Sequence, residues 1–545
     1  MKRRDFLKLS ATTSAMGLLP LELRAMLKSV NINSCDVSNR KLVLINLAGG
    51  NDGLNTTIPI NDYDTYANLR PSIKISDSGS NSYLTLDNTL PDNQLIGLHP
   101  ALTGFKSLYD KGWMRVLQSV GYPAQNKSHF ASTDLYSTGN DGNSWSNGNE
   151  SGWIGRFMET YYANELNNLY PLGVQIGSNK TSLGFHGETE HGLAINISGQ
   201  DPSGFYSELN GLGGAPPSVI ANSDYGLELQ YIIDTDRLSN QYSQAISNAF
   251  NSGNNTNSYP DTDLSNQLKT VARLISGGLE TKIYIVRIGG FDTHNNQNNN
   301  ENTIEGKHND LLTEVSEAIR SFFVDLDSQY LSDDVVGLTF SEFGRKAKEN
   351  GNFGTDHGEI APMFVFGKPV NGGVSGNNVD LSEATSDNNF QLETVQFDYR
   401  QIFGTLLQNF LGSNDTVIDT AFFNYTNNQS FTNSKINELI KDSFSVGVDC
   451  YSQTLSLEEF NPQTPHKEWF VYPNPVRNLL QVHSAKELTT IQYRVLNNRS
   501  QIILQGTQHL KNGKLEVNTE RLESGVYFIQ IFSDGKKETH KILKL

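Results

Sequence analysis

The sequence predicts an α/β fold followed by a small all-β sandwich. Short, continuous apolar runs bounded by glycine, such as Leu42 to Leu47, are typical of buried parallel strands. Segments with helical spacing alternate with these runs, and Leu102, Phe105 and Leu108 share one face of such a segment. From residue 469 onward, apolar and polar residues alternate in short runs broken by Asn, Gly and Lys, which predicts antiparallel strands.

The elements of the α/β region follow one another in a regular order. Apolar runs predict strands at 42–47, 114–121, 282–288, 335–340 and 361–367, with a further strand within 167–177. Amphipathic spacing predicts helices within 98–112, from about 128, and at 151–163, 263–278 and 308–329. This alternation favours a parallel sheet with crossover helices.

Length and composition limit the classes of protein that the chain can be. A chain of 545 residues predicts two or three domains, and 37% hydrophobic content suffices for a packed core. A net charge of −17 argues against a nucleic-acid partner, which would bind a basic face. Cys35 and Cys450 are the two cysteines, and both a disulfide and two unrelated thiols remain open from the sequence.

Residues 1–30 read as an export signal. Arg3 and Arg4 precede a short, mildly apolar stretch that is far below the roughly 18 residues of a membrane span. With the following "DFLK", this pattern resembles the twin-arginine signal, whose pathway exports folded proteins. An ordinary export signal with adjacent arginines is the alternative. No later segment is long and apolar enough to span a bilayer.

The C-terminal region has a sorting signal of its own. Residues 451–468 read as a linker, and residues 469–545 form the predicted β-sandwich. "YPNP", "LESGVYFIQI" and the final "KILKL" resemble the type IX (Por) secretion sorting domain of Bacteroidetes. The resemblance implies twin-arginine and type IX export machinery as partners, and passage through the periplasm to the outer cell surface or the medium. The resemblance also implies a cell-surface polysaccharide as a partner, to which the protein would be attached. A carbohydrate-binding β-module is the alternative.

Acidic and imidazole side chains follow several predicted strands. Asp52 comes after the first strand, Asp292 and His294 follow "KIYIVRI", and Glu342 follows "VVGLTF". Because the carboxyl ends of parallel strands share one edge of a sheet, we expect these side chains to converge. Gly49-Gly50 would allow the chain to turn sharply there.

Two further pairs belong to the same predicted site. Asp356 and His357 precede the last strand, and Ser128 and His129 stand at the predicted start of a helix, whose free N–H groups suit an anionic oxygen. Singly, such residues are more often turn or cap residues, but their repeated placement favours a metal site. Mixed Asp, Glu and His sets suit zinc, manganese or magnesium, with zinc or manganese the expected cofactor.

The order of these motifs resembles a known family. "LAGGNDGLNTTIP", "SHFASTDLYSTG", "GGFDTHNNQ", "SEFGR" and "NGNFGTDHG" resemble the domain-of-unknown-function 1501 family over about residues 40–415. That family is grouped with the alkaline phosphatase/sulfatase superfamily. The resemblance implies a domain at 40–450 with a three-layer, alkaline-phosphatase-like sheet and helices on both faces.

The resemblance also implies roles for the polar residues. Ser128 would be the nucleophile beside His129, with Ser132 or Thr133 as weaker candidates. The expected metal ligands are Asp52, Asp292, His294, Glu342, Asp356 and His357.

One motif departs from the superfamily pattern. Where the superfamily has an Asp-His pair, this chain has Glu342 and Phe343, so an imidazole is missing. His129 and His308 are the candidates to replace it.

Three functions follow from this set of expectations. The first is an exported metal-dependent hydrolase of phosphate or sulfate esters, in which a metal-activated Ser128 attacks the ester. The second is a non-catalytic surface protein that binds or scaffolds other molecules around a degenerate site. The third is a phosphotransferase or mutase, which is less expected outside the cytoplasm, where phosphorylated metabolites are scarce.

Overall fold

The protein consists of two compact units, Met1–Thr454 and Leu455–Leu545. The predicted signal, the predicted linker and both cysteines lie outside the described residues. The structure is a computed structural model that describes residues 37–544 with gaps at 144–150, 167, 178–181, 189–193, 198–241, 300–301, 424–434, 447–468, 473–475, 477, 485–489, 498–501, 510–513, 523–524 and 534–535.

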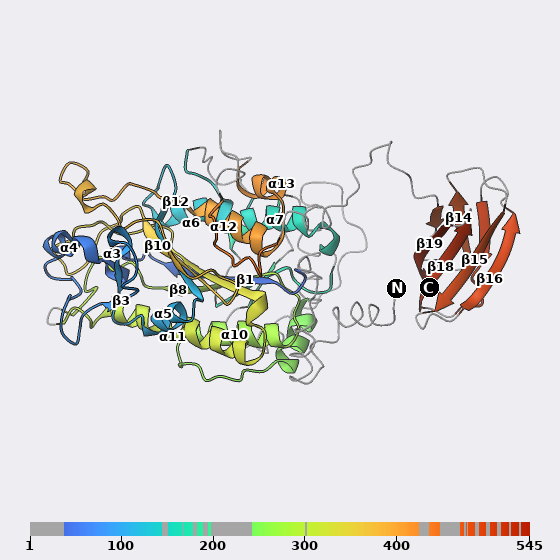
Figure 1. The fold of residues 1–545 in the computed structure, drawn as a ribbon, viewed down its shortest axis with the longest axis horizontal. Helices are drawn as coiled ribbons and strands as arrows, with labels where there is room; N and C mark the ends of the chain where they lie inside the picture. The colour runs from blue at the N-terminus through green and yellow to red at the C-terminus, as the bar shows by residue number, and fades with distance from the viewer. Residues whose placement is uncertain are drawn as a thin grey trace, which may run out of the picture. The chain divides into compact units, whose positions relative to one another are not determined.

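A mixed sheet forms the centre of the larger unit (Figure 1). Its strands are β1 (Lys41–Ala48), β5 (Met114–Gly121), β6 (Gly173–Ile176), β7 (Ala194–Ile197), β8 (Ile283–Gly289), β9 (Val335–Phe340), β10 (Ala361–Phe366), β11 (Gly373–Ser375) and β12 (Phe397–Asp398). Their order is β11-β5-β10-β9-β1-β8-β6-β7, with β12 paired to β5. β1 lies between β8 and β9 and runs parallel to both, as the sequence predicts.

The parallel arrangement expected from the sequence is wrong at β10. This strand runs antiparallel to both of its neighbours, β5 and β9. No crossover helix separates it from β9, and a parallel partner would need such a crossover. Consequently, the residues that precede β10 lie at the same edge as the residues that follow β1, β8 and β9.

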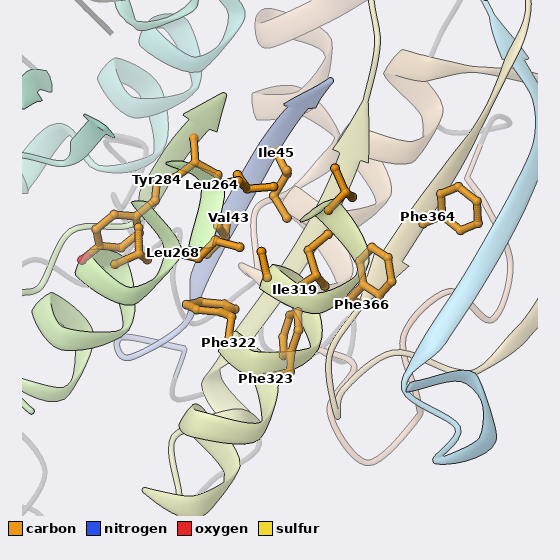
Figure 2. Packing of buried hydrophobic residues seen from close by; sticks show 14 of the residues in the cluster. Val43, Ile45, Leu264, Leu268, Tyr284, Ile319, Phe322, Phe323, Phe364 and Phe366 are labelled. Atoms are coloured by element: carbon orange, nitrogen blue, oxygen red, sulfur yellow. The ribbon is translucent and has the colours of Figure 1, made fainter. Parts of the chain in front are cut away.

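Three helices cover one face of the sheet: α5 (Thr103–Asp110), α10 (Asp263–Ser276) and α11 (Lys307–Ser328). Their amphipathic spacing, visible in the sequence, places one apolar stripe against the strands. Figure 2 shows part of the core that forms there, which includes Val43 and Ile45 of β1, Leu264 and Leu268 of α10, and Ile319, Phe322 and Phe323 of α11.

The opposite face is covered by α6 (His129–Thr138), α7 (Trp153–Tyr161) and α12 (Tyr399–Thr405). The alternate strand residues Leu42, Leu44, Ile283 and Ile285 belong to this second core. The predicted α/β class, with helices on both faces, is therefore confirmed. Smaller elements of this unit are α3 (Gly53–Thr56), β2 (Thr57–Pro59), α4 (Tyr63–Leu69), β3 (Leu84–Thr85), β4 (Ile96–Leu98) and α13 (Asp415–Ile418).

The smaller unit contains two antiparallel sheets. Its strands are β13 (Trp469–Tyr472), β14 (Leu479–Ser484), β15 (Thr490–Asn497), β16 (Ile502–His509), β17 (Lys514–Asn518), β18 (Gly525–Ser533) and β19 (Lys536–Lys544). The orders are β13-β14-β17 and β16-β15-β18-β19. Val482 and Val517 of the first sheet share one core with Val495 and Ile529 of the second, which confirms the predicted β-sandwich. None of the helices described in either unit has the length and apolarity of a membrane span.

Candidate metal centre

Three strand ends come very close together at one edge of the sheet. Gly49 and Gly50, just after β1, have φ of +124° and +77°, a region that glycine adopts at little cost. A Cβ at Gly49 would lie 2.3 Å from the backbone nitrogen of Asp292. The glycine pair therefore lets the end of β1 touch the loop that follows β8.

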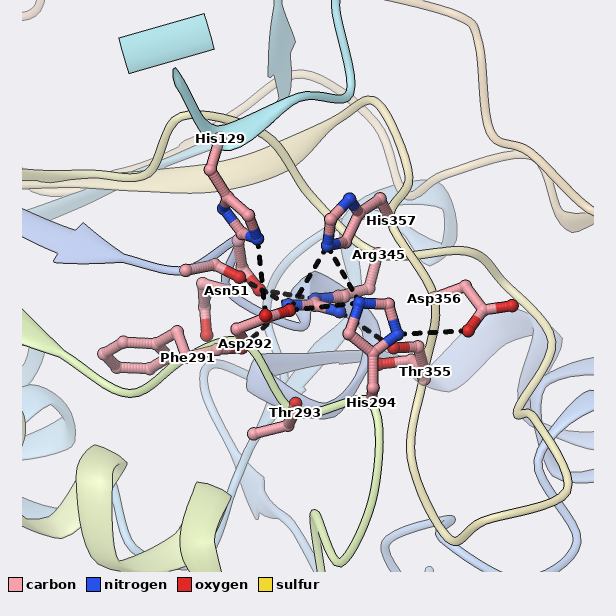
Figure 3. Close-up of polar contacts among 12 residues, drawn as sticks. Asn51, His129, Phe291, Asp292, Thr293, His294, Arg345, Thr355, Asp356 and His357 are labelled. Atoms are coloured by element: carbon pink, nitrogen blue, oxygen red, sulfur yellow. Dashed lines mark hydrogen bonds and ion pairs between the residues drawn. The ribbon is translucent and has the colours of Figure 1, made fainter. Parts of the chain in front are cut away.

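Asp292 is the centre of a polar cluster at this edge (Figure 3). Its Oδ1 lies 2.6 Å from Arg345 Nη2 and 3.2 Å from the Nε2 atoms of both His294 and His357. Its Oδ2 lies 3.4 Å from His129 Nε2. Burial alone would raise the pKa of Asp292, but Arg345 and the imidazoles outweigh it and lower this pKa to about 2. The carboxylate is thus ionised at neutral pH.

The orientation of His357 and His294 is set by oxygen acceptors. His357 Nδ1 lies 2.8 Å from the carbonyl oxygen of Lys127, which accepts hydrogen bonds and cannot donate them. His294 Nδ1 lies 3.2 Å from Asp356 Oδ1. When either ring carries one proton, these acceptors assign that proton to Nδ1, which leaves a lone pair on Nε2.

His129 is held in the same way from the start of α6. Its Nδ1 lies 2.9 Å from Glu342 Oε1, and the same oxygen accepts a hydrogen bond from the Gly49 N–H at 2.8 Å. Glu342 is 6% exposed. The Nε2 atom of His129 is buried and has no hydrogen-bond partner among the described residues. Three imidazoles therefore present Nε2 lone pairs toward Asp292.

This donor set fits a divalent transition metal. The Nε2 atoms of His294 and His357 lie 2.9 Å apart, where two lone pairs repel each other unless a cation lies near them. His129, Asp292 and His357 each offer one ligand atom, and these atoms all lie within 4.8 Å of one another. Imidazole and carboxylate ligands suit zinc and manganese, and metal-bound histidines ordinarily donate their other N–H to an oxygen.

Asp52 lies apart from this ligand group. It is fully buried, and its Oδ2 accepts hydrogen bonds at 2.6 Å from both Arg70 Nη1 and Gln297 Nε2. Burial raises the pKa of Asp52, but the charge and hydrogen bond of Arg70, together with His308 and Gln297, outweigh it and the net shift is downward. The structure thus places this predicted ligand in a fully buried ion pair with Arg70.

Two other predicted ligands contact imidazoles of the cluster at their Nδ1 atoms. Glu342 holds His129, and Asp356 holds His294 while its Oδ2 lies 3.4 Å from Lys346 Nζ. His129 stands where the missing imidazole was expected, so the first of the two candidate replacements joins the cluster.

The remaining candidates lie in different surroundings. Ser128 is the exposed N-cap residue of α6, and its side chain makes no capping hydrogen bond. Ser132 is buried, and its hydroxyl pairs with Tyr122 and the Asn126 carbonyl. His308 is buried against Asn51, with Nε2 3.2 Å from Asn51 Oδ1.

Sequence reasoning assigned no role to Arg345, although the quoted motif "SEFGR" contains it. Its Nε donates to the Gly50 carbonyl at 2.8 Å, and its Nη1 donates to the Thr355 carbonyl at 2.8 Å. Its Nη2 reaches the carbonyls of Gly49 and Phe291 as well as Asp292. This guanidinium ties together the loops after β1 and β8 and the loop before β10, which carry the side chains of the cluster. Its signal in the sequence is a cation three residues after Glu342, the first of the three in "RKAK".

Two parts of the chain match known protein families. Residues 244–413 match the family described as "Protein of unknown function (DUF1501)". Residues 470–544 match the Por secretion tail, described as a secretion system C-terminal sorting domain. The second match indicates secretion to the cell surface or beyond it. A search of curated proteins found no match.

Several solved structures are distantly similar to the chain. An alkaline phosphatase superfamily protein from Vibrio parahaemolyticus has 10% identity over 87% of this chain and 82% of its own, with a TM-score of 0.28. The PsFucS1 sulfatase from Pseudoalteromonas sp. has 10% identity over 95% of this chain and 88% of its own, with a TM-score of 0.31. Alkaline phosphatase from the Antarctic bacterium TAB5 has 12% identity over 61% of this chain and 92% of its own, with a TM-score of 0.24. Likenesses at this level carry no conclusion about activity.

Proposed function

We propose that this protein is an exported, metal-dependent hydrolase of phosphate or sulfate esters. One observation carries the proposal. Three imidazoles each bind an oxygen through Nδ1 and turn Nε2 toward the carboxylate of Asp292. The described residues supply no other partner for the buried Nε2 of His129, and zinc or manganese would satisfy it.

The residues of the cluster form two groups: the proposed metal ligands, and the residues that orient those ligands. His129, Asp292 and His357 would hold the ion, with His294 beside them. Glu342 and the Lys127 carbonyl fix the orientation of the rings, which supports tight binding. A bound divalent ion would supply Lewis acidity toward a phosphoryl or sulfuryl oxygen and toward water.

Ser128 is the proposed nucleophile. It is exposed, it precedes the metal-facing His129 directly, and its hydroxyl is not used for capping α6. The free N–H groups at the start of that ten-residue helix favour a nearby anionic oxygen. A Ser128→Ala variant with full activity on an ester substrate would remove this role and leave water as the attacking group.

We further propose the route by which the protein is exported. The twin-arginine pattern of residues 1–30 would carry the folded chain across the inner membrane, and the sorting domain would direct it through type IX secretion. This route suits a metal protein, because the ion can be inserted before export. Attachment of the mature protein to a cell-surface polysaccharide is part of this proposal.

Elemental analysis of the purified full-length chain tests the function first. We expect about one or two equivalents of zinc or manganese per chain, and a loss of metal in the Asp292→Ala/His357→Ala variant. Asp310→Ala, which removes an exposed carboxylate from α11, is the matched control and should keep the metal. The metal-loaded protein is then assayed on p-nitrophenyl phosphate and p-nitrophenyl sulfate.

Two outcomes would contradict the proposal in different ways. A chain without bound metal, even after incubation with zinc or manganese, would exclude a metallohydrolase. A metal-loaded chain that hydrolyses neither ester would favour a non-catalytic surface protein, whose cluster serves structure or binding.

A further inference from the structure

A cavity lies on the α6 and α7 face of the sheet, and it shares Glu342 with the candidate metal centre. Its volume is about 340 Å³, which is at the small end of ligand pockets and suits one or two sugar-sized rings. Thr133 and Arg287 are exposed, so the cavity reaches the surface. The residues that line it and carry the argument are Asn46, Asp134, Tyr136, Trp153, Arg287 and Phe340.

The floor of this cavity breaks the pattern of the sheet beneath it. On this face, Leu44 of β1 pairs in register with Ile285 of β8, and both are buried in the core. Two residues further along, Asn46 pairs with Arg287 on one side and with Phe340 on the other. Within the floor of the cavity, an apolar pair thus gives way to a row of amide, guanidinium and aromatic ring.

The polar groups of this row are not used by the described part of the protein. Asn46 Oδ1 is buried without a hydrogen-bond partner among the described residues, which is an unfavourable arrangement. Arg287 forms no ion pair with any described residue, and neither does Asp134 on α6. Polar groups in a cavity that lack a partner within the protein indicate that the cavity binds another molecule.

Rings and further polar groups complete the cavity wall. Tyr136 and Phe340 stack with their centroids 6.0 Å apart, and Trp153 lines the cavity beside them. Ser137 and Gln175 add a hydroxyl and an amide. Aromatic faces suit the C–H face of a sugar ring, amides and hydroxyls suit its hydroxyls, and a free guanidinium suits an acidic substituent.

We propose that this cavity binds an anionic saccharide unit. Its carboxylate or sulfate lies on Arg287, and its ring hydroxyls donate to Asn46 Oδ1 and Asp134. Glu342 lines the cavity and also holds His129, so the bound sugar lies next to a support of the metal centre. The binding site does not depend on the proposed catalysis, since binding is measured without turnover.

Binding to the full-length chain is measured by calorimetry and by the fluorescence of its tryptophans, which include Trp153. The probes are digalacturonate, galactose 6-sulfate and neutral lactose. We expect saturable binding of an acidic probe with a dissociation constant of about 1 mM or below, and none of lactose. The first two probes distinguish a carboxylated from a sulfated sugar.

Two variants make the result specific. Arg287→Gln should weaken binding of the acidic probe by at least about 10-fold, whereas Arg320→Gln on α11, outside the cavity, should not change it. Asn46→Leu extends the apolar pair, so it should abolish binding while leaving the melting temperature unchanged or raised.

Three outcomes would overturn the proposal. One is the absence of saturable binding of either acidic probe by the wild-type chain. Another is equal binding of lactose, which would remove the role of the anionic group. The third is undiminished binding by Arg287→Gln, which would place the ligand elsewhere.

Discussion

Asp52 and Asp292 begin from almost the same position and end in opposite environments. Each follows a strand at the same edge of the sheet, and each lies 2.6 Å from an arginine nitrogen. Asp52 is 0% exposed and has no imidazole within ion-pair distance among the described residues. The side chain of Asp292 is 45% exposed and contacts three imidazoles.

The comparison shows that the two carboxylates differ in exposure and in neighbouring imidazoles, and not in whether one oxygen lacks a hydrogen bond. Arg70 and Gln297 both donate to Oδ2 of Asp52 inside a closed core, so this carboxylate holds α4 and the loop after β8 together. The Oδ1 atom of Asp52 is buried without a hydrogen-bond partner among the described residues. Arg345 occupies only Oδ1 of Asp292, and Oδ2 faces the unpartnered Nε2 of His129. Asp52 therefore lies in the buried core, and Asp292 is the carboxylate around which three imidazoles gather.

The largest expected effect that tests this division is the loss of stability in Asp52→Asn. The substitution leaves the guanidinium of Arg70 buried without its counter-charge, which costs about 3–5 kcal/mol. Calorimetric unfolding of the full-length chain measures it as a lower transition for the Met1–Thr454 unit. Bound metal per folded molecule should not change.

Asp292→Asn is the control for that experiment. It should remove the metal but cost only about 1–2 kcal/mol, because water reaches Asp292 and Arg345 keeps its carbonyl acceptors. Metal loss in Asp52→Asn at full stability would reverse the assignment.

The pH dependence of stability provides a second way to separate the buried region around Asp52 from the exposed cluster around Asp292. Burial lowers the pKa of His99 to about 3 and that of His308 to about 4, and the charge of Asp52 only partly opposes it. Both rings are neutral when folded, but they take up protons on unfolding below about pH 6.5. Stability is therefore full above pH 6.5 and falls as the pH is lowered toward 4, by at most about 1.4 kcal/mol per pH unit for each histidine.

Measuring the free energy of unfolding at several pH values between 7.5 and 5 tests whether stability falls as the pH is lowered. Metal-free protein is used, so that proton competition at the metal centre does not contribute. His308→Gln should flatten the slope, since it removes one of the two buried imidazoles. Identical slopes for the variant and the wild type would show that His308 is not a source of the acid sensitivity.

Most of the fold was predictable because its signals are local. Apolar runs such as Leu42 to Leu47 and the helical spacing within 308–329 report burial of single elements. Strand direction at β10 was not predictable, because it depends on how a 20-residue loop returns to the sheet. The same loop still delivers His357 to the correct edge.

The convergence of the candidate side chains was predictable from the sequence, but their individual contacts were not. Residues at strand ends do gather there, since β1, β8 and β9 are neighbours. Whether a carboxylate such as Glu342 faces an ion or supports an imidazole depends on partners far along the chain, here His129, 213 residues away. The spacing of residues in the sequence does not predict such a contact.

Glu342→Gln tests the support role of a buried carboxylate. The amide keeps the shape but removes the charge that holds the Nδ1 proton of His129, so metal affinity should fall by roughly 10–100-fold. Competition with a metal chelator measures the affinity, and unfolding should remain close to that of the wild type. A complete loss of metal would instead indicate that Glu342 is itself a ligand.

Asp356→Asn should have the smallest effect of this series. Asp356 supports His294 as Glu342 supports His129, but its side chain is 45% exposed and its hydrogen bond is longer, at 3.2 Å against 2.9 Å. Water can replace the lost acceptor, so the affinity should fall by about 10-fold or less in the same competition assay. An effect larger than that of Glu342→Gln would mean that His294, rather than His129, holds the ion most tightly. The centre of the site would then lie between the loops after β8 and before β10, away from α6.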